Sequence, residues 1–368
     1  MGLSIGTTNL VAARVGNPPV MRRSVLTISG ERLGGFVERV GDPVPVVLAD
    51  GTTRSADELA VEALAELVGD EPPSRLAVAV PAHWPGSTLR ALRTAMRDKP
   101  NLAPNGALPR LVSDAVAALT ALHVNPGLPA VGVVALLDFG GGGTSITLAD
   151  AAASFEPIDT VRYTDFSGDQ LDQALLAHVL DGMTGAAELD PAGTAAVGSL
   201  SQLREQCRQA KEALSADDAT EFDVELPGYA STVRVTRAEF EELVGPGLVG
   251  VCSELDDVLS RNRIQWADVT TVALVGGGAR IPLIASRLTE HTQVPLVVSP
   301  VPALDAAVGA AIFAAYTQDS EAATGLAPAA LIPPMELDDP APDSATFRAL
   351  AWSQADDFDD DESIFFTD

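Results

Sequence analysis

The sequence predicts an α/β protein built from two similar lobes, and three observations lead to this fold class. A strand, a Gly/Thr turn and a second strand open the chain at residues 3–15. The same arrangement returns at residues 131–149, where four glycines, Gly140 to Gly143, join two apolar β-branched stretches. Strands and helices alternate between and after these hairpins, which is typical of mainly parallel sheets. The duplication therefore predicts one sheet in each lobe.

The remaining elements follow from hydrophobic periodicity and capping residues. Short strands and turns are expected over residues 16–51. Further strands are expected at residues 76–80, 110–112, 222–226, 232–235, 271–275 and 295–299. Helices are expected at residues 55–67, from the N-cap Ser87 to 97, 114–123, 167–181, 199–214, from the capping box at 236–239, 248–259, from 282 to about 291, and 303–316.

The four-glycine turn indicates a phosphate site. Glycines leave their backbone N–H groups unshielded, so that such a turn can wrap around a phosphate. Asp138, at the end of the entering strand, would face that ligand, and a carboxylate in this position serves a divalent cation or a water molecule. A β-turn without a ligand is the alternative. The second copy of the turn, at Gly6 to Asn9, favours the phosphate interpretation.

Composition excludes several classes of function. The formal net charge of −28 argues against nucleic acid as a partner. Cys207 and Cys252 form neither a disulfide framework nor a metal pattern, and both are expected to be buried on helices. The four histidines form no ligand pair. Because no apolar run reaches the ~18 residues of a membrane span and the N-terminus lacks a signal-peptide pattern, we expect a cytoplasmic protein.

Residues 318–368 are expected to form a disordered acidic tail. They carry thirteen acidic residues against one basic residue, Arg348, and are too rich in Ala, Pro and Asp to bury a core. Acidic and apolar residues alternate near the end, which suggests a short motif that docks on a basic, grooved protein partner. The alternative is a tail that only increases solubility. The candidate partner-binding residues are Trp352, Phe358, Ile364, Phe365 and Phe366.

A third glycine turn, Gly276 to Gly278, follows a strand and is followed by Arg280 and a helix start. Two phosphate hairpins facing a cleft resemble actin, the sugar kinases and the seventy-kilodalton heat-shock chaperones. Several motifs in one order resemble the nucleotide-binding domain of the DnaK-type chaperones specifically, over residues 1–317. These motifs lie at residues 6–9, 79–82, 138–142, 210–215, 237–243, 275–282 and 309–311.

The resemblance implies a two-lobed actin-like ATPase fold of duplicated ribonuclease-H-like domains, here truncated and divergent. The first lobe would comprise residues 1–130 and 301–317, and the second residues 131–300. It also implies ATP or ADP with Mg²⁺ as the cofactor, with Asp138 acting indirectly on Mg²⁺, and residual catalytic roles for Asp138, Thr7 and Asp114. The implied nucleotide-binding residues are Gly6, Thr7, Thr8, Asn9, Gly140, Gly141, Gly142, Lys211, Ser215, Gly276, Gly277, Gly278 and Arg280.

The departures from the family pattern concern charge. Ser4 and Ser145 stand where the chaperones have carboxylates, and Glu212 replaces an arginine of the adenosine helix. Asp114 keeps the charge of a family glutamate with one methylene fewer. Residues 10–79 are shorter than the matching segment and contain no lysine, so the outer subdomain that supplies a catalytic lysine is expected to be reduced.

Two hypotheses remain open at this point, and a third is remote. The first is a pseudo-ATPase that binds nucleotide, hydrolyses it poorly or not at all, and acts as a regulatory or adaptor module through its lobes and tail. The second is a weak ATPase whose lobes close with the nucleotide state. A sugar kinase relative is the third, but the sequence offers no candidate for a sugar-site base.

Overall fold

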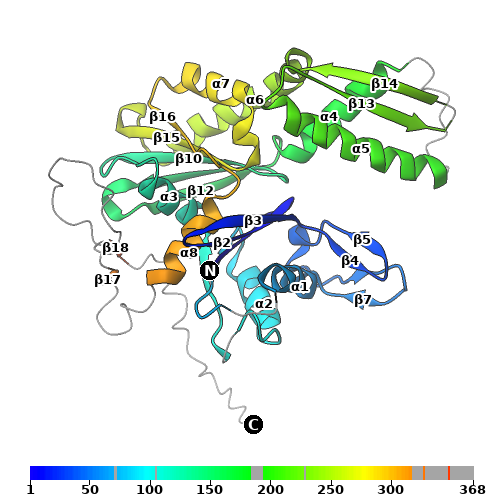
Figure 1. Ribbon diagram of the computed structural model, residues 1–368. Coiled ribbons are helices and arrows are strands. Elements are labelled where there is room, and N and C mark those ends of the chain that lie inside the picture. The colour runs from blue at the N-terminus through cyan, green and yellow to red at the C-terminus, as the bar shows by residue number, and fades with distance from the viewer. Residues whose placement is uncertain are drawn as a thin grey trace, which may run out of the picture.

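The computed structural model describes residues 1–69, 73–103, 106–183, 194–227 and 229–316, together with the short strand pair β17 (Leu326–Ala327) and β18 (Phe347–Arg348). The five candidate partner-binding residues between Trp352 and Phe366 lie outside the described residues. Figure 1 shows two sheets in separate lobes, the first blue to cyan and the second green to yellow. The mixed α/β architecture predicted from the duplicated hairpins is confirmed.

The two sheets repeat one topology. The first sheet has the order β3-β2-β1-β8-β9, and the second has the order β12-β11-β10-β15-β16. In each, the strand entering the glycine turn pairs antiparallel with the returning strand and parallel with a later strand. The strands are β1 (Gly2–Ile5), β2 (Asn9–Arg14), β3 (Asn17–Arg23), β8 (Ala77–Val80), β9 (Arg110–Ser113), β10 (Val133–Phe139), β11 (Thr144–Asp150), β12 (Glu156–Tyr163), β15 (Val269–Val275) and β16 (Leu296–Val298).

Smaller elements surround the sheets. Two short hairpins and a 3₁₀ turn follow β3, as the pattern over residues 16–51 predicts, and a longer hairpin extends from the second lobe (Figure 1). They are β4 (Leu26–Ile28), β5 (Glu31–Leu33), η1 (Val37–Arg39), β6 (Val46–Val47), β7 (Thr53–Arg54), β13 (Ala219–Leu226) and β14 (Tyr229–Thr236). The helices are α1 (Ala56–Val68), α2 (Gly86–Met96), α3 (Asp114–Val124), α4 (Gly168–Asp181), α5 (Thr194–Leu214), α6 (Arg237–Arg261), α7 (Pro282–Thr292) and α8 (Asp305–Tyr316).

Side chains cap the starts of α1, α4 and α6, whereas α2, α3 and α7 begin without a side-chain cap. Ser55 and Glu58 close a capping box on α1, and Thr236 and Glu239 close another on α6, as predicted. Ser87 is not the N-cap of α2. Pro85 precedes the helix in an extended conformation, and no side chain caps the first turn. The fixed φ of proline ends the preceding loop, so the helix begins one residue before the serine.

Residues 237–261 form one helix, whereas the sequence predicts two. Pro246 lies inside α6, where it removes one backbone hydrogen bond. Such a proline typically costs about 3 kcal/mol in a helix interior. The helix continues because one face remains buried on both sides of the proline, which offsets that cost. That face comprises Phe240, Val244, Leu248, Val251, Leu255 and Val258.

Helices α3 and α8 pack between the two lobes. The apolar side chains of α3 pack on β10 and β15 of the second sheet. Ala307 and Ala311 of α8 pack on β2 of the first sheet. The two helices touch closely at Gly309, where a Cβ atom would overlap the carbonyl oxygen of Ala117. The small residues of α8 therefore bring the chain back to the first sheet, as the sequence predicts.

The buried cores are aliphatic, and Cys207 and Cys252 are both buried on helices, as expected. Among the described residues, no helix combines the length and apolar character needed to cross a bilayer.

Candidate functional site

The first and second glycine turns contact each other across the lobes. The backbone N–H of Gly142 donates a hydrogen bond of 3.0 Å to the Thr7 hydroxyl. Gly141 lies against the hydroxyl of Thr8, where a Cβ atom would overlap it. Within the first turn, the Gly6 N–H donates to the Asn9 carbonyl at 3.1 Å. Turns that are 135 residues apart in the sequence are therefore neighbours in space.

The third glycine turn packs on the second. Gly276 has φ of +81°, and a Cβ atom there would overlap the Asp138 carboxylate and lie 2.6 Å from the Phe139 carbonyl oxygen. A Cβ atom on Gly278 would lie 2.8 Å from the Phe139 Cβ. Arg280 ends the following 3₁₀ turn, η6 (Gly277–Arg280), with an exposed side chain. All three predicted turns thus meet at the ends of β1, β10 and β15.

Two carboxyl groups share the space behind the turns. Asp114, at the start of α3, accepts a hydrogen bond of 2.9 Å from the Ala82 N–H at the end of β8. Burial and the negative charge of Asp138 raise the pKa of Asp114 to about 7. Burial also raises the pKa of Asp138. Because each charge destabilises the other, the pair favours carrying one proton near neutral pH.

Arg162 on β12 brings a positive charge to the second turn. It pairs directly across from Ser145 on β11, and its Nη1 donates a 3.2 Å hydrogen bond to the Ser145 hydroxyl. A Cβ atom on Gly143 would lie 2.6 Å from its Nε and 2.9 Å from its Cζ. Its charge opposes the rise in the pKa of both Asp114 and Asp138. Sequence reasoning missed this residue, because it expected no strand at residues 156–163 and a β-bulge between Leu148 and Ala149 shifts the register by one residue.

The candidate residues of the adenosine helix are held by other contacts. Lys211 forms a 2.7 Å ion pair with Asp172 of α4 and donates to the Gly168 carbonyl at 2.9 Å. Since the Gly168 N–H donates to the Gly140 carbonyl, Lys211 lies beside the second turn. The Ser215 hydroxyl donates to the Lys211 carbonyl at 3.4 Å, one helical turn earlier.

Glu212 connects the two lobes. Its carboxylate pairs with Arg23 of β3 at 2.8 Å, and the same guanidinium donates to the side-chain oxygen of Asn9 in the first turn. The glutamate that replaces the family's arginine therefore meets an arginine from the opposite lobe.

Glu38 is a second residue that sequence reasoning missed. It belongs to the 3₁₀ turn η1 of the first lobe, within the segment where the chaperones carry their extra subdomain. Its carboxylate lies against Gly142, where a Cβ atom would overlap it. A negative charge therefore faces the turn that we expect to receive a phosphate.

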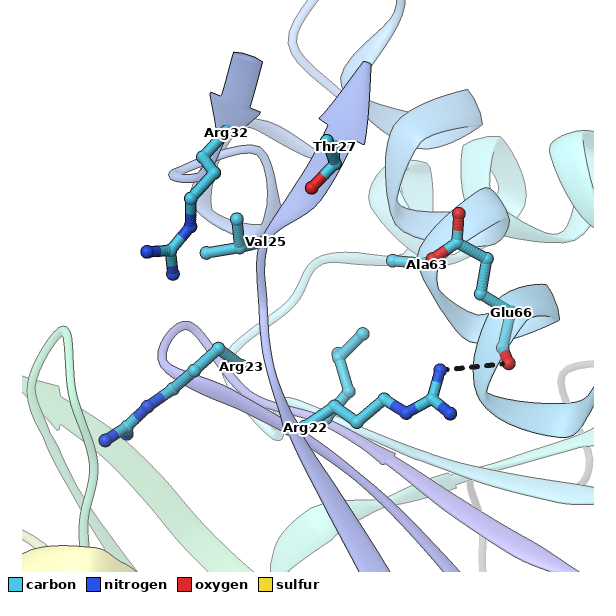
Figure 2. Close-up of a pocket in the computed structure, with 8 residues that line it drawn as sticks. Arg22, Arg23, Val25, Thr27, Arg32, Ala63 and Glu66 are labelled. Carbon is cyan, nitrogen blue, oxygen red and sulfur yellow. Dashed lines mark hydrogen bonds between the residues drawn. The ribbon is translucent and has the colours of Figure 1, made fainter. Parts of the chain in front are cut away.

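A pocket of about 240 Å³ lies within the first lobe, and its lining includes Arg23, which donates to Asn9 of the first glycine turn. Figure 2 shows Arg22, Arg23 and Arg32 around it, with Arg22 donating to the backbone carbonyl of Glu66 at 3.4 Å. Leu10, Val25 and Ala63 add apolar lining. This basic pocket is formed mainly by β3, the β4–β5 hairpin and α1.

Comparison with known proteins identifies the family. The model of the family described as "Hsp70 protein" matches residues 60–328, which is more than half of the chain. The chain belongs to the Hsp70 family. A "Chaperone protein HscA homolog" from Burkholderia thailandensis is 32% identical over 286 residues, covering 75% of this chain and 44% of the relative.

Two further relatives agree with this assignment. An HscA homolog from Acidithiobacillus ferrooxidans is 29% identical, over 77% of this chain and 43% of its own length. The "Chaperone protein DnaK" of Cenarchaeum symbiosum is 26% identical, over 62% of this chain and 35% of its own length. The chain thus spans less than half the length of the Hsp70 relatives it matches. The first glycine turn precedes the part matched by the family model.

The Mg²⁺ expected for this family does not fit the charge arrangement at the turns. Within the described residues, no group of three or more His, Cys, Asp or Glu side chains could hold a metal ion. Ser4 and Ser145 are buried neutral groups, and the carboxyls of Asp114 and Asp138 share a site with the Arg162 guanidinium. Mg²⁺ prefers oxygen ligands in near-ideal octahedral geometry, and a fixed cation beside those ligands opposes its binding.

Proposed function

We propose that this Hsp70-family chain binds ATP or ADP between its lobes and hydrolyses it slowly or not at all, acting as a regulatory or adaptor module. The observation that carries the proposal is the hydrogen bond from Gly142 to Thr7, because it unites two glycine turns from different lobes. Glycine turns bind phosphates through backbone N–H groups, which need no particular side chain. The close packing of the third turn, Gly276 to Gly278, against Asp138 supports an adenosine site beside the phosphates.

Calorimetric titration with ATP and with ADP tests binding. We expect heat release and a higher melting temperature with nucleotide, with lower affinity than in chaperones that carry an arginine in place of Glu212. A ligand present at 100 times its Kd stabilises the folded state by about 2.7 kcal/mol, which a melting experiment detects. Millimolar nucleotide that produced neither effect would contradict the proposal.

Slow hydrolysis follows from missing charged groups. Phosphoryl transfer requires a positioned water and positive charge on the developing phosphate oxygens. Removing one such stabilising group typically raises the barrier by about 2.7–4 kcal/mol. The chain has serines at positions 4 and 145 and no lysine in residues 10–79. Rapid phosphate release by the unaltered protein would contradict the pseudo-ATPase proposal.

The alternative function is a weak ATPase that closes its lobes with the nucleotide state. Asp138, Asp114, Thr7 and Lys211 favour it, because these candidate catalytic and binding groups are retained. The double substitution Ser4→Asp with Ser145→Asp should increase phosphate release if the fold is otherwise competent. A new carboxylate at 145 would face Arg162, so the triple variant that adds Arg162→Gln is the matched comparison.

The adaptor role rests on the tail. We propose that Trp352, Phe358, Ile364, Phe365 and Phe366 bind a protein partner with a basic surface, helped by the surrounding acidic residues. Deleting residues 352–368 should abolish partner capture and leave the melting temperature nearly unchanged. The matched control replaces the five apolar residues with serine and retains every charge. A deletion that unfolds the two lobes would contradict the adaptor role.

A further inference from the structure

Arg162 is fixed in place against the second glycine turn. Arg162 pairs with Ser145 in the β11–β12 register. Its guanidinium lies against Gly143, which leaves room for it because glycine has no side chain. A Cβ atom on Gly140, at the other end of the turn, would lie 3.8 Å from its Nη1. The guanidinium therefore spans the base of the turn from one end to the other.

Titratable groups from three other segments lie within electrostatic range of Arg162. It influences the pKa values of Asp114, Asp138 and His83, which come from three different segments. Among the described residues, Arg162 forms no ion pair within 4.0 Å. One of its N–H groups donates to the Ser145 hydroxyl, whereas a guanidinium has five donors. The remaining donors are therefore available to an anionic group at the turn.

Resting on the proposed nucleotide site, we propose that Arg162 supplies the positive charge that a divalent cation would otherwise bring to the phosphates, so that the protein binds nucleotide without Mg²⁺. Guanidinium groups bind phosphate oxygens through paired hydrogen bonds and stay charged at all physiological pH values. The same charge repels a divalent cation from the Asp114–Asp138 pair. At position 145 Arg162 meets a neutral serine hydroxyl instead of a carboxylate, so its other donors can bind the ligand.

A purely structural role for Arg162 makes a different prediction. If the side chain only supported the turn, its removal would weaken nucleotide binding equally with and without Mg²⁺. If it acts as the counter-charge, its removal leaves two carboxyls without their cation. Mg²⁺ should then recover part of the lost affinity, and the protein should acquire a metal dependence that the unaltered protein lacks.

The test measures the Kd of ATP for the full chain in Mg²⁺ and in EDTA by calorimetry. For the unaltered protein we expect the two values to agree within about twofold. Because hydrogen bonds between charged groups are stronger than neutral ones, Arg162→Gln should weaken binding about tenfold or more in EDTA and recover in Mg²⁺. Arg162→Lys keeps the charge and should retain most of the affinity in EDTA. Arg261→Gln, which removes an exposed cation paired with Asp159 of β12, is the control and should change neither value.

The outcomes separate this inference from the proposed function. Binding of ATP that strengthens more than tenfold with Mg²⁺ in the unaltered protein overturns the role of Arg162 and leaves nucleotide binding intact. An equal loss for Arg162→Gln in both solutions also overturns it. Absence of binding under every condition overturns the proposed function together with this inference. Melting temperatures show whether a variant has lost its fold. If Arg162→Gln does not fold, the affinities of Arg162→Lys for ATP in Mg²⁺ and in EDTA decide the result.

Discussion

The two glycine hairpins share a topology but differ in the groups that surround them. The first turn, Gly6 to Asn9, presents hydroxyl and amide side chains, and a buried neutral serine, Ser4, lies on its entering strand. The second turn has glycine at positions 140 to 143, and its charged groups come from other segments: Asp114, Arg162 and, across the lobes, Glu38.

The difference shows how a duplicated fold becomes asymmetric. The backbone hydrogen bonds that define a hairpin depend little on side chains, so both copies keep the same strand pairing. Charge depends on single residues, and the two turns differ in it: Arg23 donates to Asn9 of the first turn, whereas Asp114, Asp138 and Arg162 surround the second. The second turn also receives close approaches from neighbouring elements, so it needs glycine for packing.

The largest expected effect concerns the packing of the third turn on the second. Gly276→Ala places a side chain at φ of +81° and against the Asp138 carboxylate. Backbone strain and overpacking together should lower the free energy of unfolding by about 2–4 kcal/mol. Gly277→Ala is the matched control, because nothing lies within 4 Å of its Cβ position. Urea unfolding of both variants checks the prediction, and equal stabilities would show that the two turns are not tightly packed.

The next effect concerns the carboxyl pair behind the second turn. The pKa of Asp114 is raised from 3.8 to about 7, so the folded protein holds a proton that the unfolded chain releases. The stability contributed by this proton is complete below about pH 4 and is lost as pH rises through about 7. The slope for one group is at most about 1.4 kcal/mol per pH unit. Asp114→Asn should therefore gain stability relative to the unaltered protein between about pH 4 and pH 7.

Urea unfolding across this pH range measures the difference between the two proteins. The exposed Asp165→Asn serves as the control and should follow the unaltered protein at every pH. A constant difference between Asp114→Asn and the unaltered protein would mean that Asp114 and Asp138 do not share a proton.

A smaller effect is expected from the carboxylate that faces the second turn from the first lobe. Glu38→Gln removes a negative charge next to Gly142 and should strengthen nucleotide binding. Because Glu38 is exposed and its charge is screened, the gain should be about twofold to fivefold. Glu31→Gln, on the exposed strand β5, is the control. Calorimetry at low and at high salt checks the prediction, since a charge effect must fade with salt.

The smallest effect concerns the ion pair between the lobes. Glu212→Ala removes the contact with Arg23, whose side chain is 29% exposed while that of Glu212 is 49% exposed. Such pairs contribute about 0.2–1 kcal/mol, so the melting temperature should fall only slightly. Glu242→Ala is the control, an exposed position on α6. A large loss would indicate that this pair holds the lobes together.

Local signals predicted much of the fold correctly. The order of the glycine turns identified both hairpins, and the capping boxes at Ser55 and Thr236 marked two helix starts within one residue. These hairpins and helix starts depend on residues that are neighbours in the sequence, so they can be predicted without the tertiary structure. The N-cap predicted at Ser87 was wrong because the conformation of Pro85 outweighed the serine signal. The two helices predicted within residues 237–261 are one helix because a buried face over several turns outweighed the break expected near Pro246.

The arrangement of the site was only partly predictable. The sequence assigned Lys211 and Glu212 by analogy with the adenosine helix, whereas the structure pairs them with Asp172 and Arg23. These partners are 39 and 189 residues away, so only the packing of helices and lobes brings them into reach.

The sequence by itself determined the duplicated hairpins, the glycines at the turns and the neutral serines at positions 4 and 145, since each depends on residue identity and local pattern. The tertiary structure decided which charges meet there. Arg162 reaches the second turn because β11 and β12 pair in a register that places it opposite Ser145. Glu38 reaches the same turn because the first lobe folds over it. Electrostatic energy depends on distances between atoms, and distances between remote segments exist only once the chain has packed.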